Sequence, residues 1–270
     1  MHGAMQHYSS PSFLSASLDI KAKNVIIFGE TGVGKSSVIN LMAGSDVAET
    51  SSNLEGCTLQ ATEYSFTLSN PKMLLRVFDT VGLEESEIDV EPFIGALEKV
   101  QKLITSLRNA GGVDLILFCV KGGRFTAAME RDYHLVSEVL CNNRVPLALV
   151  ITNLESVDVM ENWWDRNQKT FEKYGIRAVA HACITSLPPH VTLYAEKRVQ
   201  SRRALQKLLQ DALNSPNPSF LQDIRDRLVT FMLSRLTSRT RRRHITKKVE
   251  TYCALPPGEA QRLAELIMQG

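Results

Sequence analysis

The sequence lacks the features of a secreted or membrane-spanning protein. No apolar run approaches the roughly 20 residues that a bilayer-spanning helix requires. Residues 1–12, M-H-G-A-M-Q-H-Y-S-S-P-S, have neither a basic start nor a continuous apolar segment. The five cysteines are odd in number, far apart and mostly set in apolar runs, which favours neither a disulfide framework nor a zinc site. They are Cys57, Cys119, Cys141, Cys183 and Cys253. We therefore expect a soluble cytoplasmic protein.

The sequence also lacks an excess of charge of one sign, since the 270 residues carry a net charge of +2. The balance is nevertheless uneven along the chain. Between Arg225 and Lys248 there are nine Lys or Arg residues and one acid, a local charge of +8 that leaves the rest at −6. We find no internal repeat, and no aromatic interleaving in the basic stretch that would indicate binding of single-stranded nucleic acid. A nucleic-acid partner is not expected.

From Asn24 onward, apolar bursts alternate with segments of helical spacing, which is typical of βα units around a mostly parallel sheet. Two neighbouring bursts are joined by S-N-P, and we expect them to form an antiparallel hairpin at the sheet edge. The expected strands are 24–29, 59–68, 73–79, 113–120, 145–152 and 178–185. The expected helices are 35–43, 91–108, 127–141, 161–174 and 193–213. This pattern predicts a three-layer α/β/α domain with six strands.

The organisation of the chain is expected to be threefold. Residues 1–20 are rich in serine and predicted to be loosely ordered. Residues 21–214 form the α/β domain, and S-P-N-P at 215–218 breaks the pattern as a linker would. Residues 215–270 form a basic helical extension. An apolar stripe in it either packs on its own domain or meets an anionic membrane surface, nucleic acid or a partner. The stripe comprises Phe220, Leu221, Ile224, Leu228, Phe231, Met232 and Leu236.

The most specific motif is G-E-T-G-V-G-K-S at 29–36, which matches the phosphate-binding P-loop between a strand and a helix. Its backbone N–H groups and the helix N-terminus are expected to hold phosphates, with Lys35 at the β- and γ-phosphates and the Ser36 hydroxyl on Mg²⁺. A tight glycine-rich turn without a ligand is the alternative. The predicted nucleotide contacts are Gly29, Glu30, Thr31, Gly32, Val33, Gly34, Lys35, Ser36 and Ser37.

A second motif, D-T-V-G-L at 79–83, follows the strand expected beside the P-loop. Asp79 is predicted to hold Mg²⁺, and the amide of Gly82 to meet the γ-phosphate. In the polar loop between the two motifs, Thr58 is predicted to bring a hydroxyl to the metal, unless it only begins a strand. Its rivals in that loop are Thr50, Ser51 and Ser52.

The order of these motifs resembles a G domain of the translation-factor-related P-loop GTPases. V-K-G-G-R-F-T at 120–126 is similar to a box of the GIMAP branch, which groups with Toc and septin GTPases, and small fungal G-domain proteins fit as well. The resemblance spans Asn24 to Ser186. It implies a Mg²⁺-dependent GTP hydrolase acting as a switch, and an ability to pair with a second copy across the nucleotide faces.

The base-reading motif departs from the family pattern. The family carries [NT]-K-x-D after the fifth strand, where this chain has Thr152, Asn153, Leu154 and Glu155. Guanine presents N1–H and an exocyclic amine side by side, and a carboxylate accepts from both. Glu155 is therefore predicted to read guanine, with Asp158 as a rival, whereas E-S-V-D as a mere helix cap is the alternative.

Two further consequences follow from this resemblance. Asn153 cannot reach as far as the family lysine, so weaker or less exclusive binding is expected, and a nucleotide-promiscuous NTPase stays open. Backbone amides after the sixth strand are the remaining base contact in the family, which assigns this role to C-I-T-S at 183–186 here, with Ile184 as the predicted contact.

The sequence does not identify a residue that would orient the attacking water. The family resemblance gives Lys35, Thr58 and Gly82 catalytic roles, but the residue after the D-x-x-G glycine is Leu83, which cannot orient water. We expect slow hydrolysis completed by Glu84, Glu85 or a residue of a second copy. Arg124 is the candidate for that residue or for an interface contact, and a solvated arginine is the alternative. A G domain that binds GTP or GDP and assembles with little turnover also stays open.

Overall fold

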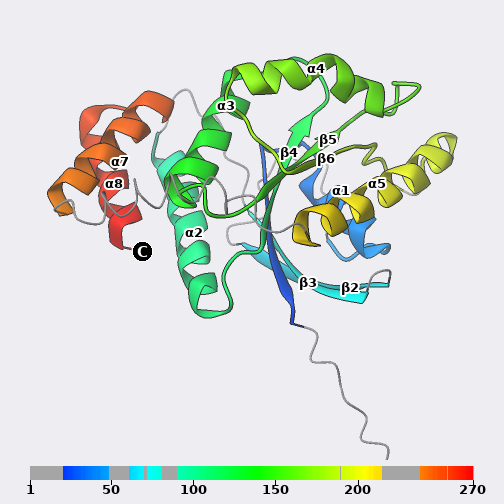
Figure 1. Ribbon diagram of the computed structural model, residues 1–270, viewed down its shortest axis with the longest axis horizontal. Coiled ribbons are helices and arrows are strands. Elements are labelled where there is room, and N and C mark those ends of the chain that lie inside the picture. The colour runs from blue at the N-terminus through cyan, green and yellow to red at the C-terminus, as the bar shows by residue number, and fades with distance from the viewer. Residues whose placement is uncertain are drawn as a thin grey trace, which may run out of the picture.

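The computed structural model describes residues 21–48, 61–69, 72–80, 90–188, 190–214, 238–253 and 255–269, and all structural statements below concern these residues. One six-stranded sheet forms the centre, in the order β2-β3-β1-β4-β5-β6 (Figure 1). The strands are β1 (Lys23–Phe28), β2 (Thr62–Ser69), β3 (Lys72–Asp79), β4 (Leu115–Lys121), β5 (Leu147–Thr152) and β6 (Ala180–Cys183).

The sheet has the predicted mixture of strand directions. β2 pairs antiparallel with β3, with Thr62 opposite Asp79, and lies at the edge. β1 runs parallel to both β3 and β4, and β5 runs parallel to β4 and β6. A mostly parallel sheet with one antiparallel edge strand was expected from the spacing of apolar bursts, and it is confirmed.

Alternation along the strands divides the core into two layers. Val25 and Ile27 of β1 pack with helices α1 (Lys35–Ala43) and α5 (Ala195–Asn214) on one face. Ile26 and Phe28 pack on the other face. The helices there are α2 (Val90–Asn109), α3 (Ala127–Tyr133) and α4 (Glu161–Lys173). Because both faces are covered, the central strands are apolar on both sides, as parallel strands require.

One helix differs from the prediction of a continuous helix over 127–141. After α3 the chain continues as a π-helix over His134–Leu140, and the Cys141 N–H donates to the carbonyl of Val136, five residues back, at 3.0 Å. Asn142 and Asn143 then adopt left-handed backbone angles with φ of 51° and 54°. The segment is closed by the Asn143 N–H, which donates to the carbonyl of Ser137 at 2.8 Å.

The predicted extension contributes two helices, α7 (Ser238–Cys253) and α8 (Pro257–Gln269). Both pack beside α2 and the π-helix, on the face opposite α1 and α5 (Figure 1). A short 3₁₀ turn, Thr192–Tyr194, precedes α5. In the portions of the chain that the structure describes, no helix combines the length and apolarity needed to cross a bilayer. The apolar stripe predicted over 220–236 lies outside the described residues.

Candidate functional site

The candidate site is built from the segments that follow β1, β3, β5 and β6. Because these strands are parallel, their carboxyl ends meet at one edge of the sheet, where open α/β sheets bind their ligands. The P-loop follows β1, Asp79 ends β3, and the base motif follows β5. The fold therefore brings together motifs that lie more than 100 residues apart.

The P-loop backbone is compatible only with glycine at two of its positions. Gly29 has φ of 146°, and a Cβ there would lie 2.2 Å from the Cys119 carbonyl oxygen of β4. Gly34 has φ of 93°, and its Cβ would lie 2.8 Å from Oγ of Ser186, which follows β6. Left-handed backbone and close approach both exclude larger residues. The P-loop therefore packs closely against β4 and against the segment that follows β6.

Helix α1 begins at this loop and leaves its N-terminus open to an anion. Gly34 is its N-cap, no side chain caps it, and no acid stands in its first turn. The first N–H groups of a helix have no intrahelical acceptor and carry a partial positive charge. Nζ of Lys35 donates to the carbonyls of Gly29 at 3.0 Å and Glu30 at 3.1 Å. The ammonium is therefore held across the loop, where phosphate oxygens are expected.

Asp79 and Ser36 provide the candidate Mg²⁺ ligands. The Ser36 hydroxyl donates to Oδ2 of Asp79 at 3.3 Å, and Asp79 is buried. Oδ1 of Asp79 is a buried atom with no hydrogen-bond partner in the described part of the chain. Burial raises the pKa of this carboxyl, while Lys35 and the Ser36 hydrogen bond act in the opposite direction. An orphaned carboxylate oxygen beside a hydroxyl fits the oxygen ligands that Mg²⁺ prefers.

Thr152, the last residue of β5, joins the base motif to the P-loop. Its buried hydroxyl lies 2.7 Å from the carbonyl oxygen of Val33 and donates to it. The adjoining Gly122 N–H donates to the Thr152 carbonyl at 2.8 Å. The role of this position is therefore to fix the two loops relative to each other.

Asn153 and Glu155 take different directions after Thr152. Asn153 has φ of 60°, an uncommon angle for a residue other than glycine, and its Oδ1 lies 3.0 Å from the Thr152 hydroxyl. Oε2 of Glu155 accepts from the Thr185 hydroxyl at 3.3 Å. The carboxylate of Glu155 thus contacts the segment after β6, whereas the Asn153 side chain lies against the end of its own strand.

The predicted segment 183–186 after β6 contains amides that are already hydrogen-bonded and one that is not. The Ile184 N–H donates to the carbonyl of Ile151 at 2.8 Å and so takes part in strand pairing. The Thr185 N–H donates to Oγ of Ser201. Within the described chain the Ser186 N–H has no hydrogen-bond partner, and Ser186 lines the cavity described next. The role of Ile184 in base contact stays a prediction, and Ser186 belongs to the same predicted segment.

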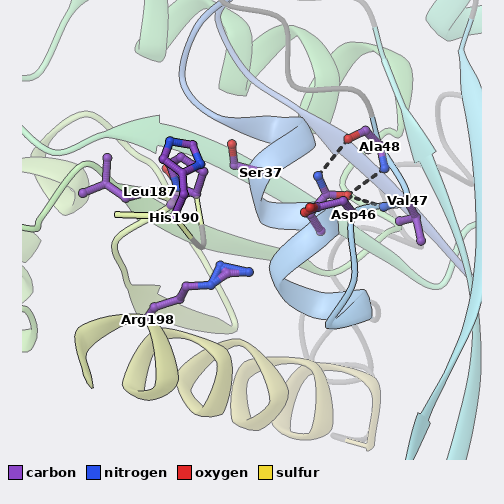
Figure 2. A pocket seen from close by; sticks show the side chains of 10 residues that line it. Ser37, Asp46, Val47, Ala48, Leu187, His190 and Arg198 are labelled. Carbon is purple, nitrogen blue, oxygen red and sulfur yellow. Dashed lines mark hydrogen bonds between the residues drawn. The ribbon is translucent and has the colours of Figure 1, made fainter. Parts of the chain in front are cut away.

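A cavity of about 360 Å³ lies beside the start of α1 (Figure 2). Such a volume is within the usual range for small-molecule sites. Asn40 shapes one wall, because its side chain accepts from the N–H groups of Val47 and Ala48 and donates to the Ala48 carbonyl, all at 2.7–2.8 Å. Arg198 extends from α5 toward the cavity. The lining is Ser37, Asn40, Asp46, Val47, Ala48, Ser186, Leu187, Pro188, His190 and Arg198.

The G-G-R-F-T segment is anchored on both sides of Arg124. The Thr126 hydroxyl donates to Oε1 of Glu30 at 3.2 Å and accepts from the Met129 N–H as the N-cap of α3. The Phe125 ring stacks on Tyr174 with 4.3 Å between centroids. Arg124 itself is exposed. The segment therefore presents an arginine to solvent directly beside the P-loop.

Several predicted residues lie outside the described part of the chain. Thr58, with its rivals Thr50, Ser51 and Ser52, falls in 49–60, and Gly82, Leu83, Glu84 and Glu85 fall in 81–89. Their assignments stay predictions. Asp158, the rival of Glu155, is exposed.

Sequence reasoning missed His190, Lys197 and Arg198, whereas Ser186 lies in the segment 183–186 that it named for base contacts. No motif marks them, because a lysine or arginine on a basic helix such as α5 looks like any solvated residue. Only the packing of α5 against the segments that follow β5 and β6, called the base loops below, identifies them.

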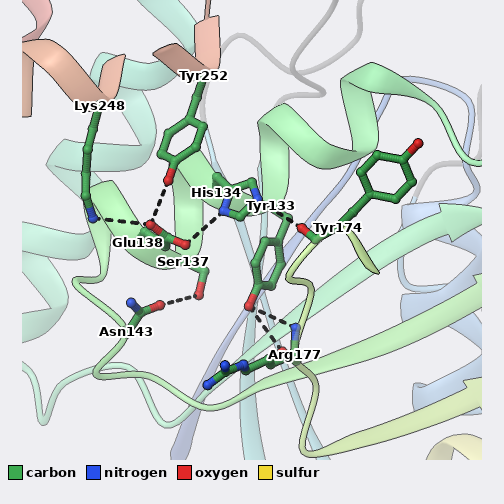
Figure 3. A network of polar contacts seen from close by, with 9 residues as sticks. All are labelled: Tyr133, His134, Ser137, Glu138, Asn143, Tyr174, Arg177, Lys248 and Tyr252. Atoms are coloured by element: carbon green, nitrogen blue, oxygen red, sulfur yellow. Dashed lines mark hydrogen bonds and ion pairs between the residues drawn. The ribbon is translucent and has the colours of Figure 1, made fainter. Parts of the chain in front are cut away.

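A second polar cluster lies away from these loops, where the extension meets the π-helix (Figure 3). Glu138 accepts from Lys248 at 3.2 Å and from the Tyr252 hydroxyl at 3.0 Å, and it pairs with Nδ1 of His134 at 2.8 Å. The His134 ring stacks on Tyr252 with 4.6 Å between centroids. Hydrogen bonding from His134, then Lys248 and Tyr252, lowers the pKa of Glu138 to about 2 against the effect of burial.

Comparison with known proteins agrees with this geometry. Residues 24–153 match the family described as 50S ribosome-binding GTPase. GTPase Der of Campylobacter fetus is 29% identical over 146 residues, 54% of this chain and 28% of Der. The probable GTP-binding protein EngB of a Wolbachia strain of Drosophila simulans is 29% identical over 160 residues, 57% of this chain and 76% of EngB. The chain thus spans under a third of Der.

Among solved structures, Toc33 from Arabidopsis thaliana in complex with GDP and Mg²⁺ is similar with a TM-score of 0.52 and 17% sequence identity. The similarity covers 74% of this chain and 87% of Toc33. At this identity the similarity concerns the fold. The shared architecture is the six-stranded sheet with its P-loop and flanking helices.

Proposed function

We propose, from the premise that this chain carries a P-loop GTPase G domain, that it binds GTP with Mg²⁺ and hydrolyses it to GDP and phosphate. The observation that carries the proposal is the arrangement of Ser36, Lys35 and the unpartnered Oδ1 of Asp79 around the P-loop. These groups supply a cation, open amides and oxygen ligands at one place. The nucleotide state would act as a switch.

The chain's own residues account for the binding of the polyphosphate. The P-loop amides and the ammonium of Lys35 neutralise phosphate oxygens without any reorganisation of the fold. Ser36 and Asp79 would hold Mg²⁺, which neutralises charge on the phosphates when it is bound. Thr58 and Gly82 are proposed to complete this side from the segments 49–60 and 81–89.

Guanine selectivity is proposed to come from Glu155, supported by the position of its carboxylate between the two base loops. The cavity lined by Ser37 and Ser186 is proposed to form part of the nucleoside site. Thr152 fixes the distance between this site and the P-loop through the carbonyl of Val33. The phosphate and base contacts would therefore be set by one rigid unit.

Turnover is proposed to be slow, because Leu83 offers no group to orient water. Glu84, Glu85 or Arg124 of a second copy would supply it. Arg124 is exposed two residues before Thr126, which bonds to Glu30 of the P-loop, and this position supports pairing across the nucleotide faces.

The test of the proposal compares wild type, Lys35→Ala and the control Lys102→Ala, an exposed lysine on α2. Calorimetric titration with GDP and Mg²⁺ should show binding for wild type and the control and none for Lys35→Ala. Phosphate release from GTP should follow the same order. The proposal would be wrong if wild type bound no purine nucleotide, or if Lys35→Ala bound as tightly as wild type.

Two related functions stay open. An assembly module with little turnover is favoured by Leu83, and phosphate release in a single turnover separates it from a hydrolase. A nucleotide-promiscuous NTPase is favoured by the position of Asn153, which turns back toward Thr152. Equal affinities for GDP and ADP would establish promiscuity.

We further propose a cytoplasmic protein divided into residues 1–20, 21–214 and 215–270, whose basic extension contacts anionic lipid surfaces. Arg241, Arg243 and His244 of α7 are exposed, which supports this contact. Sedimentation with phosphatidylserine liposomes should be lost in Arg241→Glu/Arg243→Glu. Unchanged sedimentation would exclude the contact.

A further inference from the structure

We propose that Lys197 and Ser201 of α5 are positioning residues that hold Glu155 for base selection, in place of the lysine that the base motif lacks. This inference rests on the proposed function, since it concerns how the same site distinguishes guanine. The feature that motivates it is a closed set of hydrogen bonds between α5 and the two base loops.

The first part of this arrangement is the turn that carries Glu155. Nζ of Lys197 donates to the carbonyls of Glu155 and Val157, both at 2.7 Å. These carbonyls lie 42 and 40 residues before Lys197 in the sequence. Hydrogen bonds from an ammonium are short and about twice as strong as neutral ones. One cation therefore ties the whole turn to α5.

The second part is the end of β6. Ser201 is fully buried, and its Oγ accepts from the Thr185 N–H at 3.0 Å and donates to the Lys197 carbonyl at 2.7 Å. Because Lys197 and Ser201 are four residues apart, they lie on the same face of the helix. Adjacent turns of α5 thus grip both base loops.

The third part closes the set at the carboxylate itself. The Thr185 hydroxyl donates to Oε2 of Glu155 at 3.3 Å. Glu155 is thereby held at its backbone by Lys197 and at its side chain by Thr185, whose own position depends on Ser201. Within the described residues no hydrogen bond reaches Oε1 of Glu155, which is left for a ligand.

The position of Asn153 is the reason why hydrogen bonds from α5 are needed to hold this turn. Its side chain lies against the Thr152 hydroxyl, and its backbone is left-handed. The turn that follows is therefore not secured from position 153. A site that discriminates by hydrogen bonds must hold its groups to within about 0.5 Å. In this chain α5 supplies that restraint.

The test compares GDP with IDP, which lacks the exocyclic amine that Glu155 is placed to accept. With Mg²⁺ present, wild type should bind GDP at least about tenfold more tightly than IDP, since the lost contact is a charge-assisted hydrogen bond. Lys197→Met keeps the side-chain stem and removes the donors. It should bring the IDP/GDP ratio of Kd to within about twofold of unity.

Three further variants separate positioning from general damage. Lys207→Met is the matched control, because Lys207 is an exposed lysine on the same helix that pairs only with Asp211 among the described contacts, and it should keep the wild-type ratio. Lys197→Arg retains donors and should restore most of the discrimination. Ser201→Ala should lower the ratio in the same direction as Lys197→Met, and it carries the test if Lys197→Met does not fold.

The outcomes are distinct. A wild-type ratio in folded Lys197→Met, or in Ser201→Ala if it is the variant tested, would overturn the inference while leaving nucleotide binding intact. Equal affinities of wild type for GDP and IDP would overturn it as well. Failure of wild type to bind either diphosphate would instead refute the proposed function.

Discussion

Asp79 is a buried carboxylate whose ionised form is disfavoured in the folded chain. Because burial raises its folded pKa above the unfolded value, the ionised group opposes folding at neutral pH. The protein without ligand should therefore gain stability from this group as the pH falls through the raised pKa. A bound cation removes this disadvantage, so the carboxylate charge costs stability only while the metal is absent.

Asp79→Asn should therefore stabilise the ligand-free protein by on the order of 1 kcal/mol at pH 7. The same change should abolish the part of GDP affinity that depends on Mg²⁺, because a carboxamide is a weaker ligand. Urea denaturation and titrations with and without Mg²⁺ measure the two effects. Asp165→Asn, at an exposed position on α4, is the control. A destabilised variant that retains its Mg²⁺ dependence would contradict the expectation.

Glu155 is expected to accept from the amine of guanine, and Glu155→Gln tests this by reversing one hydrogen bond. Xanthine carries a carbonyl where guanine carries the amine, and the carboxamide N–H of glutamine donates to it. The variant should lose at least about 1.5 kcal/mol of GDP affinity, the lower end for a hydrogen bond to a charged group, and gain XDP affinity. Competition between GDP and XDP measures both. Asp158→Asn should leave GDP preference unchanged, and the opposite pattern would transfer the role to Asp158.

At this scale the sequence predicted what local chemistry dictates and missed what packing creates. Gly29, Lys35 and Ser36 were predicted because a phosphate cradle requires those residue types in that order. Thr152 was predicted from the family's base motif, which follows the fifth strand. Lys197 was missed because its partners are the carbonyls of Glu155 and Val157, and any lysine donates equally well to a carbonyl. Contacts between a side chain and a backbone carbonyl far away in the sequence leave no pattern in it.

At the scale of elements, the contact between the extension and the π-helix depends on one carboxylate. The Glu138 carboxylate is hydrogen-bonded to His134 of its own helix and to Lys248 and Tyr252 of α7 (Figure 3). Its pKa is lowered to about 2, so the stability it contributes is present above the unfolded value of about 4.5 and lost as the pH falls toward 2. We therefore expect acid to weaken the contact between α7 and the π-helix.

Glu138→Gln should lower the free energy of unfolding by on the order of 1–2 kcal/mol at pH 7, allowing for partial exposure of the side chain. The difference from wild type should shrink below pH 4.5 and vanish near pH 2. Denaturation at a series of pH values measures it. Glu172→Gln, at an exposed position of α4, should show no such difference. A difference that is independent of pH would exclude a role for the charge.

The π-helix shows where element prediction failed. H-L-V-S-E-V-L has a spacing that suits an ordinary helix, and the spacing predicted one as far as Cys141. The wider turn is closed by Asn143, whose N–H bonds to Ser137 and whose Oδ1 accepts from the Ser137 hydroxyl at 3.2 Å. Asparagine after a helix is an ordinary end signal, so the sequence does not distinguish the two helices.

At the scale of the whole molecule, pairing across the nucleotide faces would make turnover depend on concentration. If Arg124 completes the site of a second copy, phosphate release per protomer should rise with protein concentration. Arg124→Ala should lower the rate at high concentration by at least about tenfold, on the scale of an arginine supplied in trans, and abolish the dependence. Arg144→Ala is the control, because Arg144 precedes β5 at the opposite edge of the sheet. A rate independent of concentration in both proteins would remove the idea.

The architecture was predictable because it depends on burial alone. Strands β1, β4 and β5 are covered on both faces, and only continuous apolar runs such as L-A-L-V-I-T satisfy both layers. The positions of α7 and α8 were not predictable in the same way. These positions depend on the packing of Val249, Ala260 and Leu263 in the core layer that contains α2. Apolar residues at helical spacing predict a buried helix face but not the element that covers it.

The grip of α5 on both base loops has a consequence for biosynthesis. A ribosome releases the P-loop early, but Lys197 and Ser201 emerge about 160 residues later. Until then the turn at Glu155 lacks its hydrogen bonds to α5. A nucleotide stabilises a nascent chain only if the chain binds that nucleotide. Chains interrupted before α5 would therefore be left to the quality-control machinery without the protection that ligand gives the finished domain.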